Sequence, residues 1–294
     1  MRIEVRGLTK RFGAVTALRD LCFEVPAGRR VAIVGPNGSG KSTLNRVLLG
    51  LLSYEGEARI AGRDAFTERA AIAARLAYVP QLAPALAVPA GEWIRAVLRL
   101  RGLAPQGLEK LAARLELPLD AIARRPLRAL SGGTRQKLLV ALALAAEPSL
   151  LILDEPTGSL DPESRERVLG LVDALPRETT VVLCSHRLAE IRVLVDEVIA
   201  LAEGALASRT PIADWVEASL VNVIEVAAHP RAGAWLEARG FRRGATGAWR
   251  RPAAREEKLG LLAVLSAELG GDLLDVTVRE LDAVRLDGEP PDAA

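Results

Sequence analysis

The sequence has few aromatic residues, few cysteines and no long apolar run. Aromatic residues make up only 3% of the 294 residues, so we expect no stacking platform for single-stranded nucleic acid. Cys22 and Cys184 are the two cysteines, too few for a disulfide framework, which favours a reducing compartment. The longest apolar run, Leu138–Ala146, is shorter than the about 18 residues that cross a bilayer. We expect it to be a buried helix.

An excess of charge of one sign is also missing. The chain has 39 Lys and Arg against 37 Asp and Glu, a formal net charge of +2. Binding to nucleic acid depends on a basic surplus, so no nucleic-acid partner is expected. The segment Met1–Val5 alternates like a strand and has no apolar core of a signal peptide, so we expect a cytoplasmic protein. A role in a membrane process would then require a second chain.

The hydrophobic pattern predicts an α/β protein with two domains. Short apolar strands alternate with helical periodicity up to about residue 210, which is typical of a parallel sheet with helices around it. From Val221 onward a β-α-β-α-β pattern predicts a small α+β unit. We therefore expect a first domain at residues 1–212 and an accessory domain at residues 213–294.

A glycine-rich loop follows the apolar segment Arg30–Val34 and precedes a helical pattern predicted over residues 42–52. Its sequence fits the phosphate-loop pattern in full. Glycines let backbone N–H groups surround phosphates, and the start of a helix favours an anion. We expect the loop to bind ATP through Gly35, Asn37, Gly38, Gly40, Lys41, Ser42 and Thr43. Lys41 is expected to reach the β- and γ-phosphates, and Ser42 to hold Mg²⁺.

Two adjacent carboxylates end a second apolar segment, Leu150–Leu153. Asp154 is placed to contact Mg²⁺, and Glu155 is the expected catalytic base that polarises the attacking water. An Asp-Glu pair after an apolar strand is weak evidence alone, but behind a phosphate loop it indicates ATP hydrolysis. The sequence thus predicts an ATPase that uses Mg²⁺.

A third motif places Ser131, Gly132 and Gly133 at the start of a predicted helix. Alone, this pattern could be an ordinary helix cap. In this order behind the phosphate loop, it resembles the signature motif of ABC ATPases. That family holds ATP between two cassettes arranged head to tail, so the resemblance implies a homodimer. Thr134 departs from the Gln that many members carry at this position.

Further positions match motifs of this family in sequence order, and the resemblance covers residues 1 to about 210. It implies that Phe12 stacks on adenine, that Gln81 senses Mg²⁺ and water, and that His186 contacts the γ-phosphate. Asp161 falls in the segment that crosses the dimer interface and is expected to bind nucleotide. The implied catalytic residues are Glu155, His186, Lys41 and Gln81, and the implied metal site is Ser42, Gln81 and Asp154. The implied fold is a P-loop NTPase with antiparallel β and helical subdomains, the latter over residues 85–145.

The resemblance also implies a role in transport. Such ATPases drive a separate integral membrane permease, so we expect a peripheral protein on the inner face of the cell membrane. The extension containing Leu281–Val284 is similar to that of ATPases paired with ABC-2-type permeases, which suggests an exporter. It could dimerise, regulate or cap the domain, and we favour dimerisation. Trp93, Ile94 and Val97 either pack as helical core or form a groove that receives a permease helix.

Two other classes of protein carry the same fold. A soluble ABC ATPase of DNA repair or translation usually has a long coiled-coil insertion, a zinc site or tandem ATPase domains, and none is visible in the sequence. A non-catalytic regulator would lack Glu155 or Lys41, and both are present. The ATPase of a transporter is therefore the favoured prediction.

Overall fold

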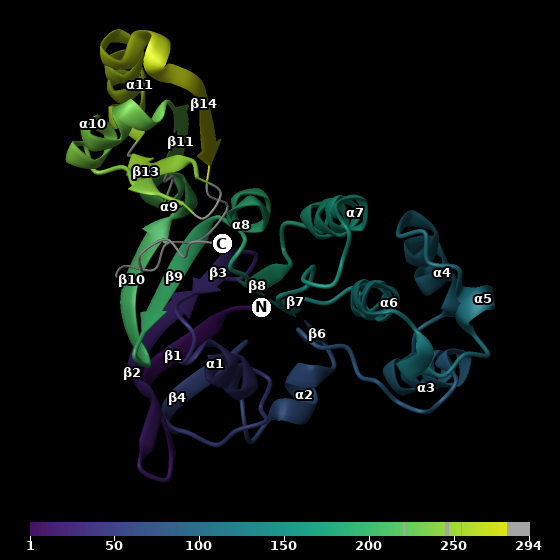
Figure 1. Ribbon diagram of the computed structural model, residues 1–294. Helices are drawn as coiled ribbons and strands as arrows, with labels where there is room; N and C mark the ends of the chain where they lie inside the picture. Colours follow the sequence, from purple (N-terminus) through teal and green to yellow (C-terminus); the bar gives the residue numbers. More distant parts are fainter. Residues whose placement is uncertain (220–221, 245–246, 254, 281–294) are drawn as a thin grey trace. The chain divides into compact units, whose positions relative to one another are not determined.

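The computed structural model describes residues 1–219, 222–244, 247–253 and 255–280. The chain separates into two compact units, of which the first is Met1–Ile212 and the second begins at Ala213 (Figure 1). The segment Leu281–Val284, which carries the likeness to ABC-2-linked ATPases, lies outside the described residues. Each unit has its own buried core.

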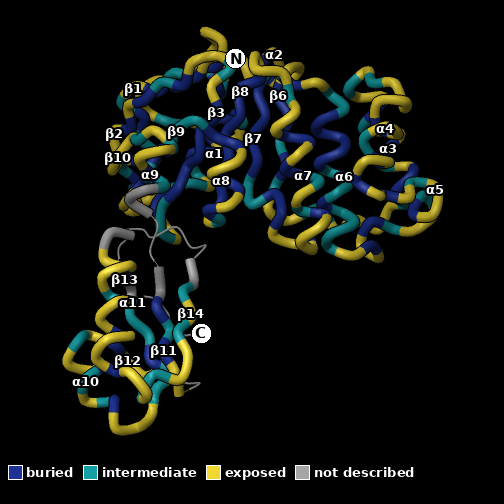
Figure 2. Tube along the Cα trace, turned by 90° about the horizontal axis from the view of Figure 1, so that it is seen from above, coloured by how far each residue is buried: buried dark blue, intermediate teal, exposed yellow. Residues whose placement is uncertain are grey.

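A six-stranded sheet forms the centre of the first unit, every residue of which is described, with strand order β10-β9-β3-β8-β7-β6. Its strands are β3 (Arg30–Val34), β6 (Leu76–Val79), β7 (Leu150–Asp154), β8 (Thr180–Cys184), β9 (Glu197–Ala202) and β10 (Ala205–Pro211). All neighbours pair in parallel except β10, which is antiparallel to β9. β3 and β8 are buried at every position, as Figure 2 shows, because such strands are covered on both faces.

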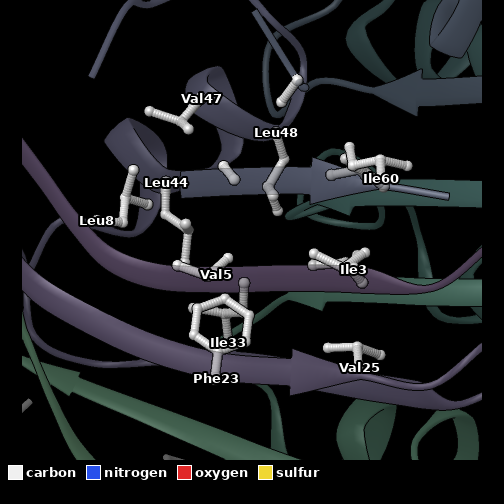
Figure 3. Packing of buried hydrophobic residues seen from close by; sticks show 14 of the residues in the cluster. Ile3, Val5, Leu8, Phe23, Val25, Ile33, Leu44, Val47, Leu48 and Ile60 are labelled. Atoms are coloured by element: carbon white, nitrogen blue, oxygen red, sulfur yellow. The ribbon is translucent and has the colours of Figure 1, made fainter. Parts of the chain in front are cut away.

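An antiparallel sheet of order β2-β1-β4-β5 packs on the first helix. Its strands are β1 (Ile3–Phe12), β2 (Val15–Val25), β4 (Glu55–Ile60) and β5 (Arg63–Asp64). Along β1, the alternate residues Ile3 and Val5 are buried. They share one apolar cluster with Leu44 and Leu48 of α1 (Lys41–Leu48) (Figure 3). This cluster fixes α1 directly behind the glycine-rich loop.

Helix α1 ends earlier than the predicted range of residues 42–52. Gly50 adopts a left-handed conformation with φ +68°, and a Cβ atom there would lie 2.4 Å from the carbonyl oxygen of Ala65. The chain turns at this glycine because the neighbouring segment passes so close to its backbone. The boundary depends on a contact between distant segments, so helical periodicity alone places it wrongly.

The predicted helical subdomain is observed between β6 and β7. It contains α3 (Ala90–Arg101), α4 (Pro105–Arg114), α5 (Leu119–Ile122) and α6 (Gly132–Ala145), which lie together in both views (Figure 1 and Figure 2). The remaining helices of this unit are α2 (Arg69–Ala73), α7 (Pro162–Asp173) and α8 (Leu188–Leu194). Across the described part of the chain, no helix combines the length and apolar character that a bilayer span requires.

The second unit alternates strands and helices around an antiparallel sheet. After α9 (Ile212–Ser219), its elements are β11 (Asn222–Ala228), α10 (Gly233–Ala238), β12 (Arg242–Arg243), β13 (Trp249–Ala253), α11 (Arg255–Leu269) and β14 (Leu273–Glu280). Among its described residues the strand order is β12-β13-β11-β14, and the sequence β-α-β-β-α-β is that of a ferredoxin-like fold. The sequence pattern missed β12, because two arginines carry no apolar alternation.

We expect the α1 cluster to be essential for the stability of the first unit. Leu48 is 1% exposed, so Leu48→Ala should lower the free energy of unfolding by about 2–5 kcal/mol through lost burial and a residual cavity. Leu100→Ala is the matched control, because Leu100 is 86% exposed and its truncation should cost at most about 0.5 kcal/mol. Urea unfolding followed by far-ultraviolet circular dichroism measures both. Equal losses in the two variants would contradict this account.

Candidate nucleotide site

Three neighbouring parallel strands end at the same edge of the central sheet. β3 leads into the glycine-rich loop, β7 into Asp154 and Glu155, and β8 into the segment of His186. β8 lies between β3 and β7, and Asp154 pairs with Cys184 across the β7–β8 ladder. The loops that carry the predicted catalytic residues therefore emerge side by side, at the edge where α/β sheets bind ligands.

The glycine-rich loop is closed on one side by backbone from other segments. A Cβ atom on Gly35 would lie 2.3 Å from the carbonyl oxygen of Leu201, and one on Gly40 would lie 2.7 Å from that of Ala17. Both glycines have positive φ angles, which side chains disfavour. These positions require glycine, and Asn37 and Gly38 are exposed at the surface of the loop.

Lys41, the first residue of α1, folds back over this loop. Its Nζ donates hydrogen bonds to the carbonyl oxygens of Gly35 and Pro36, the latter at 2.9 Å. Burial lowers the pKa of Lys41, and the negative charges of Glu155 and Asp154 oppose that shift. Ser42 is exposed in the same helical turn. The ammonium is thus placed over the loop, where a phosphate group would offer it stronger acceptors.

Asp154 is surrounded by neutral donors. Tyr78 Oη donates to its Oδ2 at 3.4 Å, and Asn45 donates to it and, at 3.2 Å, to Cys184 Sγ. Burial raises the pKa of Asp154, while the hydrogen bonds of Asn45 and Tyr78 oppose the rise. Burial also raises the pKa of Tyr78 to about 12, so this donor stays neutral. The carboxylate is therefore oriented without an ion-pair partner in contact among the described residues, which suits a group that contacts a cation.

The chemistry of these side chains fits Mg²⁺. No cluster of three or more His, Cys, Asp or Glu side chains suited to a metal occurs in the described residues. Mg²⁺ in proteins is commonly held by one or two carboxylates together with phosphate oxygens and water. The carboxylate of Asp154, the hydroxyl of Ser42 and the amide oxygen of Gln81 would serve as oxygen ligands of this kind.

Glu155 and His186 form a hydrogen-bonded pair just beyond the two strand ends. Nδ1 of His186 lies 2.8 Å from Oε1 of Glu155, and the backbone N–H of Glu155 donates to the carbonyl oxygen of Cys184 at 2.8 Å. Glu155 has φ +45°, a conformation that is uncommon for a side-chain-bearing residue and often occurs at functional sites. Burial raises the pKa of Glu155, and the hydrogen bond from His186 opposes the rise. A carboxylate with a raised pKa is suited to accept a proton.

The predicted signature motif forms the start of α6. Ser131 is the N-cap, and its Oγ accepts from the backbone N–H of Thr134 at 3.1 Å. The hydroxyls of Ser131 and Thr134 are also 2.7 Å apart, so Thr134 contacts the very group that the resemblance assigns to phosphate. A Cβ atom on Gly133 would lie 3.0 Å from the carbonyl oxygen of Ser159. The glycine allows α6 to approach the loop after β7 closely.

The remaining predicted residues lie in separate parts of the first unit. Phe12 ends β1 and is 46% exposed, with Lys10 Nζ 5.2 Å from its ring centre. Gln81 is exposed just after β6. Asp161 is the N-cap of α7, and its two carboxylate oxygens accept hydrogen bonds from the backbone N–H and the hydroxyl of Ser164. The structure thus gives Asp161 a capping role, and its contact with nucleotide stays a prediction.

Sequence reasoning missed several polar residues that support this site. Asn45 and Tyr78 contact Asp154, and Gln136 Nε2 donates to the carbonyl oxygen of Pro80 at 3.2 Å, next to Gln81. Asn45 and Gln136 are each 1% exposed. Their sequence signal is a polar residue on the apolar side of a helix, since such a residue needs a hydrogen-bond partner when buried.

Two comparisons identify the family. Residues 18–158 match the family model described as ABC transporter. The chain is also 36% identical over 215 residues to the aliphatic sulfonates import ATP-binding protein SsuB 2 of Pseudomonas aeruginosa, covering 71% of this chain and 75% of that protein. The chain belongs to the family of ABC transporter ATP-binding proteins. The predicted ATPase activity is confirmed at the level of this family.

Further ABC proteins are similar in sequence and in fold. The phosphonates import ATP-binding protein PhnC of Anaeromyxobacter dehalogenans is 34% identical over 270 residues, which cover 86% of this chain and about half, 51%, of that protein. A solved dimeric ATP-binding cassette, in a post-hydrolysis state bound to ADP and Pi, superposes with a TM-score of 0.64 at 25% identity. The match covers 71% of this chain and 98% of that one. The predicted ABC ATPase fold is confirmed.

The raised pKa of Glu155 predicts a cost to stability at neutral pH. When a carboxyl group has a higher pKa in the folded than in the unfolded protein, its ionisation lowers the free energy of unfolding. Glu155→Gln should therefore raise the melting temperature at pH 7 without nucleotide. The gain should shrink as the pH falls through the raised pKa. Glu116→Gln is a control of opposite sign, because Arg167 lowers the pKa of the exposed Glu116. Calorimetry across pH that shows Glu155→Gln to be less stable than the wild type would contradict this prediction.

Proposed function

We propose that this ABC ATPase dimerises head to tail around ATP and drives a separate membrane permease. The observation that carries the proposal is the presence of two glycine-containing helix starts in one unit. One is the loop before α1 and the other is the start of α6, and these helices lie apart in both views (Figure 1 and Figure 2). A second copy would bring its α6 to the phosphates bound at α1 of the first. The solved cassette noted above is dimeric, which supports dimerisation of this chain.

Each composite site would draw on both copies. Phe12 would stack on the adenine, the glycine-rich loop and Lys41 would bind the phosphates, and Ser131 and Gly133 of the second copy would donate to the γ-phosphate. Ser42, Asp154 and Gln81 would hold Mg²⁺, which when bound neutralises charge on the phosphate oxygens. The second copy would exclude water from the site and so strengthen each electrostatic contact.

Glu155 would act as the base for attack by water on the γ-phosphate. Its carboxylate would orient the water and accept a proton as the water oxygen bonds to the γ-phosphorus, while the bond from that phosphorus to the β–γ bridging oxygen breaks and ADP leaves. His186, hydrogen-bonded to Glu155 at 2.8 Å, would hold the carboxylate and present its exposed ring to the γ-phosphate. Lys41 would stabilise the negative charge on the phosphate oxygens. Hydrolysis would then allow the two copies to separate.

An apolar groove in the first unit supports a permease partner. Its volume is about 390 Å³, and it is lined by residues of α3 and α6 with others from α1 to β6, among them Leu51, Trp93, Val97 and Leu139. Ile94 is buried, so the predicted helix contributes to both the core and the groove. Exposed apolar surface of this kind marks interaction sites. We propose that an intracellular helix of the permease binds here and holds the protein at the inner membrane face.

The specific proposal remains an exporter of ABC-2 type, in which the second unit promotes dimerisation. It rests on the likeness of the extension containing Leu281–Val284, a segment outside the described residues, to that of ATPases paired with ABC-2-type permeases. The sulfonate and phosphonate relatives carry names of import proteins, so accumulation rather than expulsion of cargo by the reconstituted transporter would overturn it. Stimulation of the ATPase by DNA or ribosomes would instead favour the alternative, a soluble ATPase of DNA repair or translation.

We expect Glu155→Gln to hydrolyse ATP about 10²–10⁴-fold more slowly, since this is the usual contribution of a general base. The variant should still bind Mg-ATP and accumulate as an ATP-bound dimer. Phosphate release and light scattering after gel filtration measure the two properties, and Glu166→Gln on the exposed side of α7 is the matched control. Wild-type hydrolysis by Glu155→Gln would overturn the catalytic assignment. A variant that stays monomeric with ATP would mean that another chain completes the site.

The groove should be required for membrane association. Val97→Asp places a charge among apolar groove residues, so the fraction of protein that sediments with membranes of the native host should fall at least about threefold. Val193→Asp is the control, because Val193 is 54% exposed on α8 and does not line the groove. ATP hydrolysis by purified Val97→Asp should match the wild type. Equal sedimentation of the two variants would exclude the groove as the docking site.

A further inference from the structure

Three buried polar side chains without a role in the proposed site contact one another beside Glu155 and His186. Glu190 and Thr157 are each 0% exposed, and Ser185 is 5% exposed. Thr157 follows Glu155 by two residues, Ser185 precedes His186, and Glu190 lies in the first turn of α8. One buried carboxylate is therefore in contact with both loops that carry the catalytic pair.

The carboxylate of Glu190 divides its two oxygens between these loops. Thr157 Oγ1 donates to Oε1, and Ser185 Oγ donates to Oε2 at 2.8 Å. Ser185 Oγ also accepts from the backbone N–H of Arg187 at 3.1 Å, and Arg187 Nε lies 3.7 Å from Oε1. Burial of a carboxylate is unfavourable unless it is hydrogen-bonded and its charge is balanced. Here both conditions are met, so the arrangement is well defined.

The catalytic pair needs such support because it lies beyond the paired part of the sheet. The β7–β8 ladder ends with Asp154 opposite Cys184. Glu155 directly follows Asp154, and His186 lies two residues after Cys184. A single backbone hydrogen bond, from Glu155 to Cys184, continues across the two segments at that point. The side chain of Glu190 joins them again two residues farther along the β7 side.

We propose that Glu190 is a positioning residue for ATP hydrolysis: by holding Thr157 and Ser185, it keeps Glu155 and His186 at hydrogen-bond distance. This inference rests on the proposed roles of Glu155 and His186. Glu190 does not itself contact water or nucleotide, because it is fully enclosed and both of its oxygens accept hydrogen bonds. Burial is the main cause of the raised pKa of Glu155, and the negative charge of Glu190 adds to it.

Glu190→Ala and Glu190→Gln test this role in the full-length protein. Displacement of a catalytic group by about 1 Å can cost up to about 10²-fold in rate, so Glu190→Ala should lower kcat about 10- to 100-fold. KM for Mg-ATP and the Kd for ATP should change less than about twofold, because Phe12 and the glycine-rich loop are not touched. Glu190→Gln should recover most of kcat, since its amide can accept from one hydroxyl and donate to the other.

Two further variants, each lacking one hydrogen bond to Glu190, test the inference if Glu190→Ala fails to fold. Thr157→Val and Ser185→Ala each remove one hydrogen bond and should each lower kcat about 3- to 10-fold at unchanged KM. Glu178→Ala, an exposed carboxylate of the same unit, is the control. Wild-type kcat in Glu190→Ala, or in both Thr157→Val and Ser185→Ala, would overturn the inference. Equal changes in kcat and KM in these variants would overturn it as well. Wild-type hydrolysis by Glu155→Gln would instead show that the proposed catalytic assignment fails.

Discussion

The pairing of Asp154 with Cys184 at the end of the β7–β8 ladder connects the parts of this nucleotide site. The next backbone bond along, from the N–H of Glu155 to the carbonyl oxygen of Cys184, holds Glu155 in its left-handed conformation. The thiol of Cys184 accepts from Asn45, which belongs to the helix that starts with Lys41. The carboxylates, the histidine segment and the phosphate-loop helix are therefore positioned by a rigid sheet edge, which defines geometry more sharply than flexible loops do.

Burial at this sheet edge makes the charged forms of Asp154, Glu155 and Lys41 unfavourable while no ligand is bound. It raises the pKa of Asp154 and of Glu155 and lowers that of Lys41, so each group is less stable in its charged form than it would be in water. Lys41 meanwhile bonds to neutral carbonyl oxygens of its own loop. A phosphate and a cation supply the missing opposite charges. Stability given up at this edge is thus recovered when the ligand binds, as is common at functional sites.

The sequence allows the contiguous parts of this site to be predicted, because their signals are local. Ser131 and Asp161 cap the helices that follow them, and the loop before Lys41 and the Asp154–Glu155 pair each stand at the end of a strand. The supporting contacts are of another kind. Asn45 and its acceptor Cys184 are 139 residues apart, and Gln136 and Pro80 are 56 apart. No periodicity within a segment reports such partners, so a polar residue on an apolar helix side marks Asn45 and Gln136 as buried but does not identify the groups that they bind.

Helix α6 contacts the loops after β6 and β7 and also carries the signature motif at its start. Its first turn presents Ser131, its glycines touch Ser159 of the loop after β7, and its buried Gln136 donates to Pro80 of the loop after β6. Any displacement of α6 along its axis must carry Pro80 and Ser159 with it or break these close contacts, because packed interfaces deform little. Gln81 follows Pro80 directly, and the groove beside Trp93 and Leu139 includes the same helix. A force applied at the groove would therefore reach the loops of the nucleotide site through a buried side chain rather than through solvent.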